Sequence, residues 1–470
     1  MLSPVGQRPM KTSLQKGEGM LNKTFRGGVH PKGQKALSSE SPLRWFPAKG
    51  DMVYPLSQHI GKPAKPVVKK GDSVLVGSCL AEADGFVSAP IYCGCSGTVK
   101  AIEKRRIISG ALAECIVVEN DGAYTLAEGV GEERDLSEVS NSEILDCVQN
   151  AGIVGLGGAG FPTHVKLRPK NPDGIRFIIA NGAECEPYLT CNDQLMREYA
   201  DGIVAGLDLV LRLFPNAEGV IGIEDNKPEA IASMEKAASG RARMRVLPLQ
   251  TKYPQGGEHN LIHVITGADY PVSKLPADMG CIVDNVGTLY AIWRAVAFHE
   301  PLFSHCFTLS GEAVKNPGNY IVRDGTSLQE IIDASGGLKE GVTLKKALAG
   351  GPMMGFAISD LSAPVQKTTN GLTLLTEDGS ELSQKKQTSC LRCGRCSAAC
   401  PTGLVPQLML EAAQLGDYER YEKKLYGLEC VACGCCAFIC PARRPLTETF
   451  KAVKAEIMAR KRAAQAGGAK

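Results

Sequence analysis

Two matched cysteine runs near the C-terminus constrain the fold of this chain more than any other feature. Both have the spacing C-x2-C-x2-C-x3-C-P, as follows: Cys390, Cys393, Cys396, Cys400 and Pro401, then Cys430, Cys433, Cys436, Cys440 and Pro441. In bacterial proteins with this spacing, three cysteines of a run and the fourth of the other run bind one four-iron cluster. The prediction is two [4Fe–4S] clusters with these ligand sets: Cys390, Cys393, Cys396 and Cys440 for one, and Cys430, Cys433, Cys436 and Cys400 for the other.

A pair of structural zinc sites is the alternative, because zinc also binds four cysteines. Two complete runs, each with its terminal proline, favour clusters. The chain has 18 cysteines, and dense runs in a protein without an export signal indicate metal sites more often than disulfides. Cys435 lies inside the second run and is predicted not to be a ligand. The segment from Gly403 to Glu429 is rich in Leu, Glu, Ala and Lys, which predicts two helices between the runs.

The composition is that of a globular protein, with 44% hydrophobic and 22% charged residues. The formal net charge of +3 is too small to indicate nucleic-acid binding. No stretch approaches the ~20 apolar residues of a membrane-spanning helix. The first residues lack an apolar signal-peptide region, so we expect the chain to stay in the compartment where it is made. Met20 is a candidate for the true start.

Changes in hydrophobic period predict several modules. The predicted boundaries are a flexible N-terminus at 1–24, a β module at 25–135, an α/β domain at 136–302, a small α+β module at 303–375, the cysteine domain at 376–450 and a basic tail at 451–470. In the α/β domain we predict a helix capped by Asn141 or Ser142 and a strand at 176–180. A helix at 201–214, a strand at 219–223 and a helix at 228–239 follow. This alternation predicts an open α/β sheet with its site at the strand ends.

A glycine-rich loop follows the first predicted helix. Gly155, Gly157 and Gly160 match G-x-G-x-x-G, which alone is a weak signal, and the usual dinucleotide fingerprint follows a strand instead. Glycine N–H groups can nevertheless lie against a flat ring or a phosphate, and Lys166 comes just after them. The alternative is a glycine-rich turn next to a surface lysine.

The loop resembles part of the flavin- and NADH-binding subunit family of respiratory complex I. The shared motifs are G-x-G-G-A-G-F-P-T-x-x-K at 155–166, N-x-x-E-x-E-P at 181–187, a G-G-E segment at 256–258 and N-V-x-T at 285–288. The resemblance implies that FMN is held by the following residues: Gly155, Gly157, Gly158, Gly160, Lys166, Asn181, Asp284, Asn285 and Thr288. It also implies that Phe161, Glu184 and Glu186 lie by the nicotinamide and ribose of NAD(H), and that Glu258 lies near the flavin.

A wider resemblance covers residues 25 to about 450. The segments FRGGVHPKGQK at 25–35, PLSQHIGKPAKPVVKKGDSVLVGS at 55–78 and GGPMMG at 350–355 resemble RnfC, the family of NADH-side subunits of the Rnf complex. This resemblance implies a multidomain α/β and α+β fold. Its parts would be an N-terminal β barrel-sandwich, a Rossmann-like α/β flavin domain, a β-grasp module and a helical two-cluster ferredoxin domain.

Some residues fall outside these motifs. Cys93-Gly-Cys95 departs from the family pattern, and we interpret the pair as buried free thiols, with a redox-active or metal-binding pair as the alternative. His30, His59 and His164 have no metal-site spacing and are interpreted as structural. The basic tail has the composition of a solvated helix face. An anionic membrane surface is the alternative partner for Arg443, Arg444, Arg460, Lys461 and Arg462.

The resemblance implies an NADH-linked oxidoreductase subunit of an ion-translocating complex. FMN would join two-electron chemistry on NADH to one-electron clusters, so Glu184, Glu186 and Glu258 would orient groups and would not transfer protons. The expected partners are other Rnf subunits, ferredoxin through the complex, and a membrane reached through those subunits at its cytoplasmic face. No arginine is placed for a 2′-phosphate, which favours NADH over NADPH. The alternatives are a soluble flavin and iron–sulfur reductase, such as a microcompartment cobalamin reductase, and a non-catalytic electron conduit.

Overall fold

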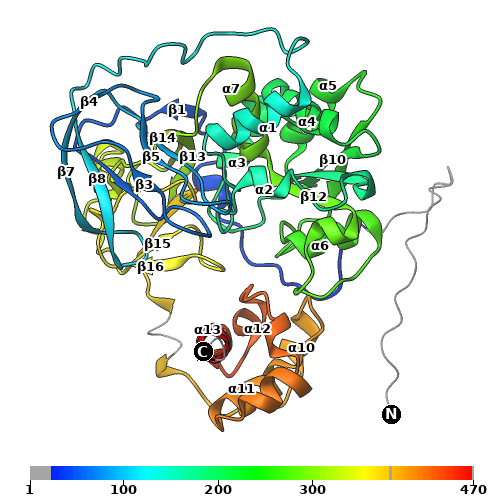
Figure 1. Cartoon of the computed structure of the whole chain (residues 1–470). Helices are drawn as coiled ribbons and strands as arrows, with labels where there is room; N and C mark the ends of the chain where they lie inside the picture. The colour runs from blue at the N-terminus through cyan, green and yellow to red at the C-terminus, as the bar shows by residue number, and fades with distance from the viewer. Residues whose placement is uncertain (1–22, 380–383, 468–470) are drawn as a thin grey trace. The chain divides into compact units, whose positions relative to one another are not determined.

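The computed structural model describes residues 23–379 and 384–467 (Figure 1). Contacts divide the described chain into two compact units. The larger unit comprises Lys32–Pro248 and Gly280–Asp378. The smaller unit joins three separate stretches, namely the described residues up to Pro31, Leu249–Met279 and the described residues from Gly379 onwards. The predicted start at Met20 lies outside the described residues.

The larger unit begins with a module of short strands, as the alternating pattern predicts. Its strands are β2 Met52–Pro55, β3 Lys65–Pro66, β4 Ser73–Val74, β5 Cys79–Glu82, β6 Ile91–Tyr92, β7 Gly97–Arg106 and β8 Leu112–Asn120. They form a four-stranded sheet of order β2-β8-β7-β4 and a three-stranded sheet of order β3-β5-β6. Cys93 and Cys95 lie in the core of this module, both fully buried and not joined by a disulfide, with their Sγ atoms 3.8 Å apart. They are therefore buried free thiols, as interpreted from the sequence.

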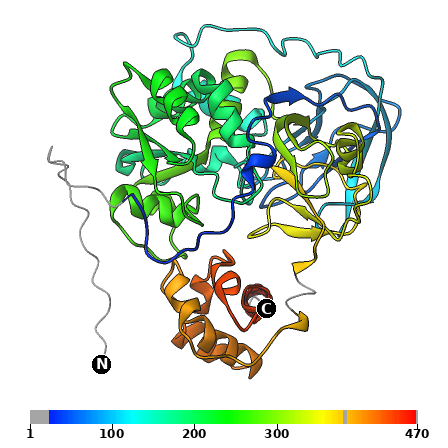
Figure 2. The same ribbon diagram turned by 180° about the vertical axis from the view of Figure 1, so that it is seen from behind.

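A six-stranded sheet lies beside the β module in both views of the fold (Figures 1 and 2). Its order is β1-β14-β13-β17-β15-β16, and its elements are β1 Leu43–Trp45, β13 Ser304–Ser310, β14 Gly318–Arg323, α8 Leu328–Ala334, β15 Lys346–Ala349, β16 Phe356–Ile358 and β17 Gly371–Leu375. The strands and helix predicted within 304–340 are present. One cluster of buried side chains, including Tyr54, Ile116, Phe307 and Leu372, is shared by this sheet and the β module, so the two fold around a common core.

The α/β part supplies the parallel sheet that the sequence predicted. Strand β9 (Phe177–Gly182) pairs in parallel with both β10 (Glu218–Glu224) and β12 (Cys281–Asn285), in the order β11-β10-β9-β12 with β11 at Met244–Leu249. Its helices are α1 Asn141–Asn150, α2 Thr163–Lys166, α3 Cys191–Glu198, α4 Ala200–Leu213, α5 Pro228–Ala238 and α7 Val286–Phe298. The predicted cap of α1 was wrong by one or two residues. Ser140 is the N-cap, because its hydroxyl and the Glu143 carboxylate form a capping box.

Helices α4 and α7 approach so closely that only glycine fits at one contact. A Cβ atom on Gly206 would lie 1.9 Å from the carbonyl oxygen of Leu289, so Gly206→Ala must push the helices apart. Overpacking of this kind costs about 1–3 kcal/mol, although alanine is favoured over glycine in a helix by ~1 kcal/mol. We expect the thermal unfolding midpoint to fall by several degrees. The exposed control Asp208→Ala loses only a surface ion pair with Arg241. A Gly206→Ala variant more stable than the parent would contradict this packing.

The smaller unit contains the cysteine runs. Its helices are α6 Glu258–Thr266, α10 Arg395–Ala399, α11 Pro406–Gln414, α12 Cys435–Ile439 and α13 Leu446–Gly467. Between the runs, α11 is the first of the two predicted helices, and the second is a short π-helical turn at Arg420–Lys424. Apolar residues of α11 and α13, among them Met409, Phe450 and Val453, form its core. The predicted basic tail is thus helical as far as Gly467, the last residue described, and Val453 and Ile457 of this helix are packed in the core.

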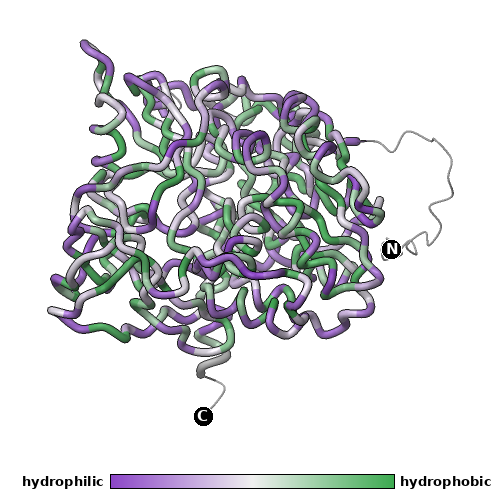
Figure 3. Tube along the Cα trace, turned by 90° about the horizontal axis from the view of Figure 1, so that it is seen from above, coloured by the Kyte–Doolittle hydropathy of each residue, from purple (hydrophilic) through white to green (hydrophobic). Residues whose placement is uncertain are grey.

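Hydrophobic and hydrophilic stretches alternate along the described chain (Figure 3). Within residues 23–379 and 384–467, no helix is both long enough and apolar enough to cross a bilayer.

Candidate redox sites

The glycine loop is a closed turn whose tip is open to solvent. Gly155 N donates to Phe161 O at 2.9 Å, and Val154 forms an isolated bridge with Pro162. Gly157 and Gly160 have φ angles of +71° and +69°, which side chains disfavour. A Cβ on Gly158 would have no heavy atom within 4 Å. The tip of the loop is therefore exposed, with open space beside Gly158, and the loop follows α1 as the sequence predicted.

Two strand ends lie against this loop. Asn181 and Asn285 are partners in the β9–β12 register, and Asn285 Nδ2 lies 3.3 Å from where a Gly157 Cβ would be. Asn285 Oδ1 accepts from Gly287 N at 2.7 Å, which caps α7, and Thr288 Oγ1 accepts from Leu156 N at 2.9 Å. The loop is thus tied to the first turn of α7 by the residues that the sequence predicted.

A buried ion pair completes this site. Lys166 Nζ lies 3.1 Å from Asp284 Oδ1 and donates to Val283 O at 2.8 Å. The Asp284 side chain is 0% exposed and that of Lys166 is 23% exposed. Burial raises the pKa of Asp284, while the Lys166 ammonium opposes that shift. Lys166 therefore compensates a buried carboxylate, and its Nζ lies 3.6 Å from where a Gly155 Cβ would be.

A buried lysine, Lys367, contacts the residues just before the glycine loop. Lys367 Nζ donates to Pro90 O and Gly152 O, both at 2.7 Å, and burial lowers its pKa to about 8. Gly152 ends α1 immediately before the glycine loop, and Pro90 belongs to the β module. The three modules of the larger unit therefore meet at the base of this loop.

Glu184 lies at the start of helix α3. Its carboxylate is buried and accepts from Asn192 N at 3.0 Å and from Asp193 N at 3.3 Å. Burial raises the pKa of Asp193 to about 6, and Glu184 contributes in the same direction. Lys227 lies behind them in a buried pair with Glu224, at 2.9 Å. The predicted role of Glu184 at a nucleotide stays a prediction.

Glu186 contacts a loop from a distant part of the sequence. Its Oε1 accepts from Met353 N at 2.6 Å and from Met354 N at 3.1 Å, and Lys35 Nζ donates to Glu186 O at 3.0 Å. From the sequence alone, Lys35 and GGPMMG had no role beyond family motifs. The Gly-Gly-Pro sequence was the one signal that could have indicated a close contact at this loop. In the structure, a Cβ on Gly351 would lie 2.5 Å from Glu186 Cγ, so only glycine fits there.

Removing the Glu186 carboxylate should loosen the 351–354 loop. A hydrogen bond to a charged group contributes about 1.5–3 kcal/mol, so Glu186→Ala should speed amide hydrogen exchange at Met353 and Met354 by about tenfold or more. The control is Glu198→Ala, which removes the carboxylate that accepts from Leu43 N at 2.9 Å and should leave the two methionine amides unchanged. Unchanged exchange in Glu186→Ala would show that the loop is held by other contacts.

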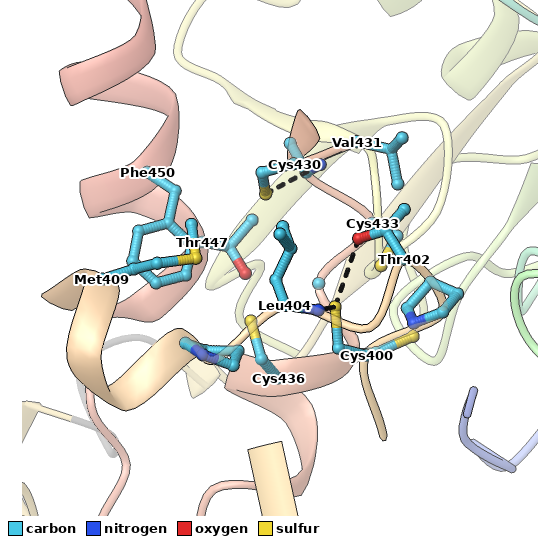
Figure 4. A pocket seen from close by; sticks show the side chains of 15 residues that line it. Cys400, Thr402, Leu404, Met409, Cys430, Val431, Cys433, Cys436, Thr447 and Phe450 are labelled. Atoms are coloured by element: carbon cyan, nitrogen blue, oxygen red, sulfur yellow. Dashed lines mark hydrogen bonds between the residues drawn. The ribbon is translucent and has the colours of Figure 1, made fainter. Parts of the chain in front are cut away.

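Five cysteines of the smaller unit line a hollow, namely Cys400, Cys430, Cys433, Cys435 and Cys436. Cys400, Cys430, Cys433 and Cys436 surround it, together with apolar side chains such as Met409 and Phe450 (Figure 4). Burial raises the pKa of Cys436 to about 12, and the neighbouring thiols, Cys400 among them, act in the same direction. Cys400, Cys430, Cys433 and Cys436 are the four residues predicted to share one cluster, so the donor set and the apolar lining fit a [4Fe–4S] group.

The other predicted set is more exposed. Cys390 and Cys393 are exposed, whereas Cys396 and Cys440 are half-buried. Burial raises the pKa of Cys396, and Cys440 adds to this shift, so a residue of each run lies close to the other. The extra cysteine, Cys435, is fully buried and its Sγ lies 3.8 Å from Tyr253 O. Among the described residues, no group of three or more His, Cys, Asp or Glu side chains is arranged to hold a single metal ion.

Comparison with known proteins gives four family matches along the chain. They are the RnfC barrel sandwich hybrid domain at 23–123, the Nuo51 FMN-binding domain at 148–294, the SLBB domain at 306–357 and a 4Fe-4S dicluster domain at 383–442. The RnfC subunit of the proton-translocating ferredoxin:NAD(+) oxidoreductase complex of Clostridium ljungdahlii is 42% identical, over 92% of this chain and 94% of the relative. The chain belongs to the RnfC family.

A second relative extends the RnfC assignment. The RnfC subunit of the Na(+)-translocating ferredoxin:NAD(+) oxidoreductase complex of Acetobacterium woodii is 39% identical over 93% of this chain and 98% of its own length. A solved NAD+-reducing [NiFe]-hydrogenase chain aligns at a TM-score of 0.48 and 20% identity, over 67% of this chain and 66% of that one. For this RnfC family member, the dicluster match decides between clusters and zinc, and the FMN-binding match coincides with the glycine loop and both strand ends.

Glu258 is the one predicted flavin-site residue that belongs to the smaller unit. It is the first residue of α6, whereas the glycine loop, Lys166, Asn181, Asp284, Asn285 and Thr288 all belong to the larger unit. Its placement near the flavin stays a prediction.

Proposed function

We propose that this chain is the electron-transferring RnfC subunit of an Rnf-type ferredoxin:NAD oxidoreductase complex, and that it passes electrons between NAD(H), FMN and two [4Fe–4S] clusters. The observation that carries the proposal is the convergence of the glycine loop with Lys166, Asp284, Asn285 and Thr288 at one edge of the parallel sheet. The 42% identical relative is named as the same subunit of such a complex.

The residues of the larger unit fit FMN. The N–H groups of Gly157 and Gly158 and the Lys166 ammonium provide donors and positive charge for a phosphate, and the flat glycine surface suits a ring. Asp284 holds Lys166 in place, and Asn181 and Asn285 offer amide groups at the strand ends. Bound there, FMN would take two electrons from NADH as a hydride and release them singly.

NAD(H) would bind beside the flavin, with Phe161, Glu184, Glu186 and Glu258 as the orienting residues. Glu186 is well placed to orient a ligand because the 351–354 loop fixes its carboxylate. No arginine for a 2′-phosphate was recognised in the sequence, so NADH is favoured over NADPH.

In the smaller unit, the proposal assigns one cluster to Cys390, Cys393, Cys396 and Cys440. The other is assigned to Cys430, Cys433, Cys436 and Cys400, which line the hollow. Backbone N–H groups lie 3.4 Å from the Sγ atoms of Cys390, Cys400 and Cys430. Such hydrogen bonds stabilise thiolates and raise cluster potentials.

The finer architecture and the setting belong to the same proposal. The domains are a β barrel-sandwich at 25–135, a Rossmann-like flavin domain at 136–302, a β-grasp module at 303–375 and a helical ferredoxin domain at 376–450. The partners are the other proteins of the complex and, through them, ferredoxin. The chain associates peripherally with the membrane through those proteins, at the cytoplasmic face.

Anaerobic purification followed by NADH addition tests the proposal. We expect about eight irons and one FMN per chain and rapid bleaching of the cluster absorbance by NADH, with little effect of NADPH. Eight irons without FMN and without a response to NADH would favour a non-catalytic conduit. The relatives found are components of complexes, which speaks against a free-standing cobalamin reductase.

A further inference from the structure

The residues immediately before strand β17, at 366–370, form a segment that is held at both ends. Near its start, Lys367 Nζ donates to Gly152 O at 2.7 Å. At its end, Asn370 O accepts from Thr308 N at 3.1 Å. The segment therefore connects the base of the glycine loop to the six-stranded sheet, and its side chains extend from a fixed backbone.

This segment lies along the glycine loop. A Cβ on Gly160 would lie 2.7 Å from Cγ2 of Thr368, and a Cβ on Gly157 would lie 3.9 Å from Nδ2 of Asn370. Together with the contact of Lys367 at the base, three residues of the segment meet three different points of the loop. Asn370 is the polar residue that reaches Gly157, whose φ angle of +71° keeps the position free of a side chain.

The carboxamide of Asn370 lies between two loops of the site. Its Nδ2 is on the side of Gly157, and its Oδ1 lies 4.0 Å from where a Gly350 Cβ would be. Gly350 directly precedes the 351–354 loop, which fixes the carboxylate of Glu186. The side chain of Asn370 is thus situated between the loop proposed for FMN and the loop that holds a residue proposed for NAD(H).

The folded chain itself makes no use of this carboxamide. Among residues 23–379 and 384–467, neither Oδ1 nor Nδ2 of Asn370 has a hydrogen-bond partner, although the residue is half-buried. The asparagines already assigned to the site differ, because Asn285 Oδ1 accepts from the backbone of α7 and Asn181 Oδ1 accepts from Ala183 N at 3.1 Å. Polar groups that are shielded from water are nearly always paired, and a few placed polar groups are what orient a ligand in its site. The unused carboxamide therefore indicates a ligand.

We propose that Asn370 is a further FMN-binding residue of this subunit, and that its carboxamide hydrogen-bonds FMN bound at the glycine loop. The inference rests on the proposed function, since it adds a residue to the flavin site of that electron path. A carboxamide both donates and accepts hydrogen bonds, so it suits FMN, which has acceptors on its phosphate and ring carbonyls and a donor on its ring. Asn370 binds and orients, and it transfers no proton.

NAD(H) is the competing ligand, because Glu186 is fixed next to Gly350. The surroundings of Gly157 favour FMN. Nδ2 of Asn285 lies 3.3 Å from the same Cβ position that Asn370 Nδ2 approaches to 3.9 Å. Two carboxamides from different parts of the chain thus converge on one glycine of the loop, and a ligand lying on this glycine is within reach of both.

The test measures FMN binding by the full, cluster-loaded chain after its FMN has been removed. Equilibrium dialysis gives the Kd for the parent, Asn370→Ala and Asn370→Leu, of which the leucine variant keeps the volume of the side chain. The matched control is Asn216→Ala, at an exposed asparagine whose Nδ2 lies 3.4 Å from Asp173 O. Riboflavin, which lacks the phosphate, is measured in parallel. The thermal unfolding midpoint of the FMN-free chain reports any purely structural role.

We expect the Kd for FMN to rise by about fivefold to tenfold in both Asn370 variants, as for the loss of one hydrogen bond, and to stay within about twofold in the control. The midpoint of the FMN-free chain should not change, because the carboxamide has no protein partner among the described residues. An equal rise for riboflavin would place the hydrogen bond on the ring or the ribityl chain. A rise for FMN alone would place it on the phosphate, and both results support the proposal.

FMN binding at the parent's level in both variants would overturn the proposal, and a raised Kd for NADH in those variants would then assign Asn370 to NAD(H). Weaker binding in the leucine variant alone would indicate steric obstruction and would also overturn it. So would weaker binding together with a lower midpoint of the FMN-free chain, which would make Asn370 a structural residue. Absence of FMN from the parent is a different result, because it would overturn the proposed function and this inference with it.

Discussion

The double variant Cys400→Ser/Cys430→Ser is expected to keep one of its two [4Fe–4S] clusters, whereas Cys390→Ser/Cys400→Ser is expected to lose both. In the proposed arrangement Cys400 and Cys430 are ligands of the same cluster, since both line the hollow with Cys433 and Cys436. Replacing two ligands of one cluster removes that cluster only. Replacing Cys390 and Cys400 removes a ligand from each.

Iron and acid-labile sulfide per chain distinguish the arrangements. The crossed arrangement predicts about four irons in the first double variant and close to none in the second. If each run instead held its own cluster, the two results would be exchanged. Cys400→Ser/Cys430→Ser would then remove a ligand from each cluster and lose nearly all its iron, whereas Cys390→Ser/Cys400→Ser would remove two ligands of one cluster and keep about four irons. Cys435→Ser is the control, since Cys435 directs its Sγ at Tyr253 O, and it should keep about eight irons. A loss of iron in that control would make Cys435 a ligand and contradict the assignment.

The cysteine spacing was sufficient to predict this centre because the cysteines of each run lie within a few residues of one another. The difference in exposure between the two runs was not predictable in the same way. It arises from Tyr253 and its neighbours, which are distant in sequence and cover only the second run. Spacing determines the local turn, but burial depends on contacts between distant segments.

The larger unit shows the same division between local and non-local information. The helices and strands that were predicted between 141 and 239 are present nearly to their predicted ends, because their periodicity is local. Helix α3 and strand β11 were not predicted. Strand β1 was assigned to the β module, yet it pairs with β14, about 275 residues later. The glycine loop was recognised from its motif, whereas the attachment of Glu186 to Met353 and Met354 required the folded sheet to bring the 351–354 loop to it.

Lys166→Met is expected to abolish FMN binding and to destabilise the larger unit. Lys166 places a positive charge next to Gly155 of the glycine loop and also compensates Asp284, whose side chain is 0% exposed. Removing one partner of a buried ion pair costs about 3–5 kcal/mol, because the other charge is left uncompensated. FMN retained after gel filtration and the thermal unfolding midpoint report the two effects.

The destabilisation should depend on pH. Burial already raises the pKa of Asp284, and Lys166 opposes that shift, so the pKa rises further in Lys166→Met. A folded-state pKa above the unfolded value means that the folded chain binds the proton more tightly, so stability falls as pH rises between the two values. The difference in the free energy of unfolding between Lys166→Met and the parent should therefore shrink as pH is lowered, because the Asp284 carboxyl becomes protonated.

The double variant Lys166→Met/Asp284→Asn separates binding from stability. With the carboxylate removed, no buried charge is left uncompensated, and most of the lost stability should return at neutral pH while FMN stays unbound. The matched control is Lys170→Met, at a nearby exposed lysine, which should keep both FMN and stability. FMN binding by Lys166→Met at the parent's level would remove Lys166 from the flavin site. Recovery of FMN in the double variant would show instead that the lysine acts only by supporting the fold around Asp284.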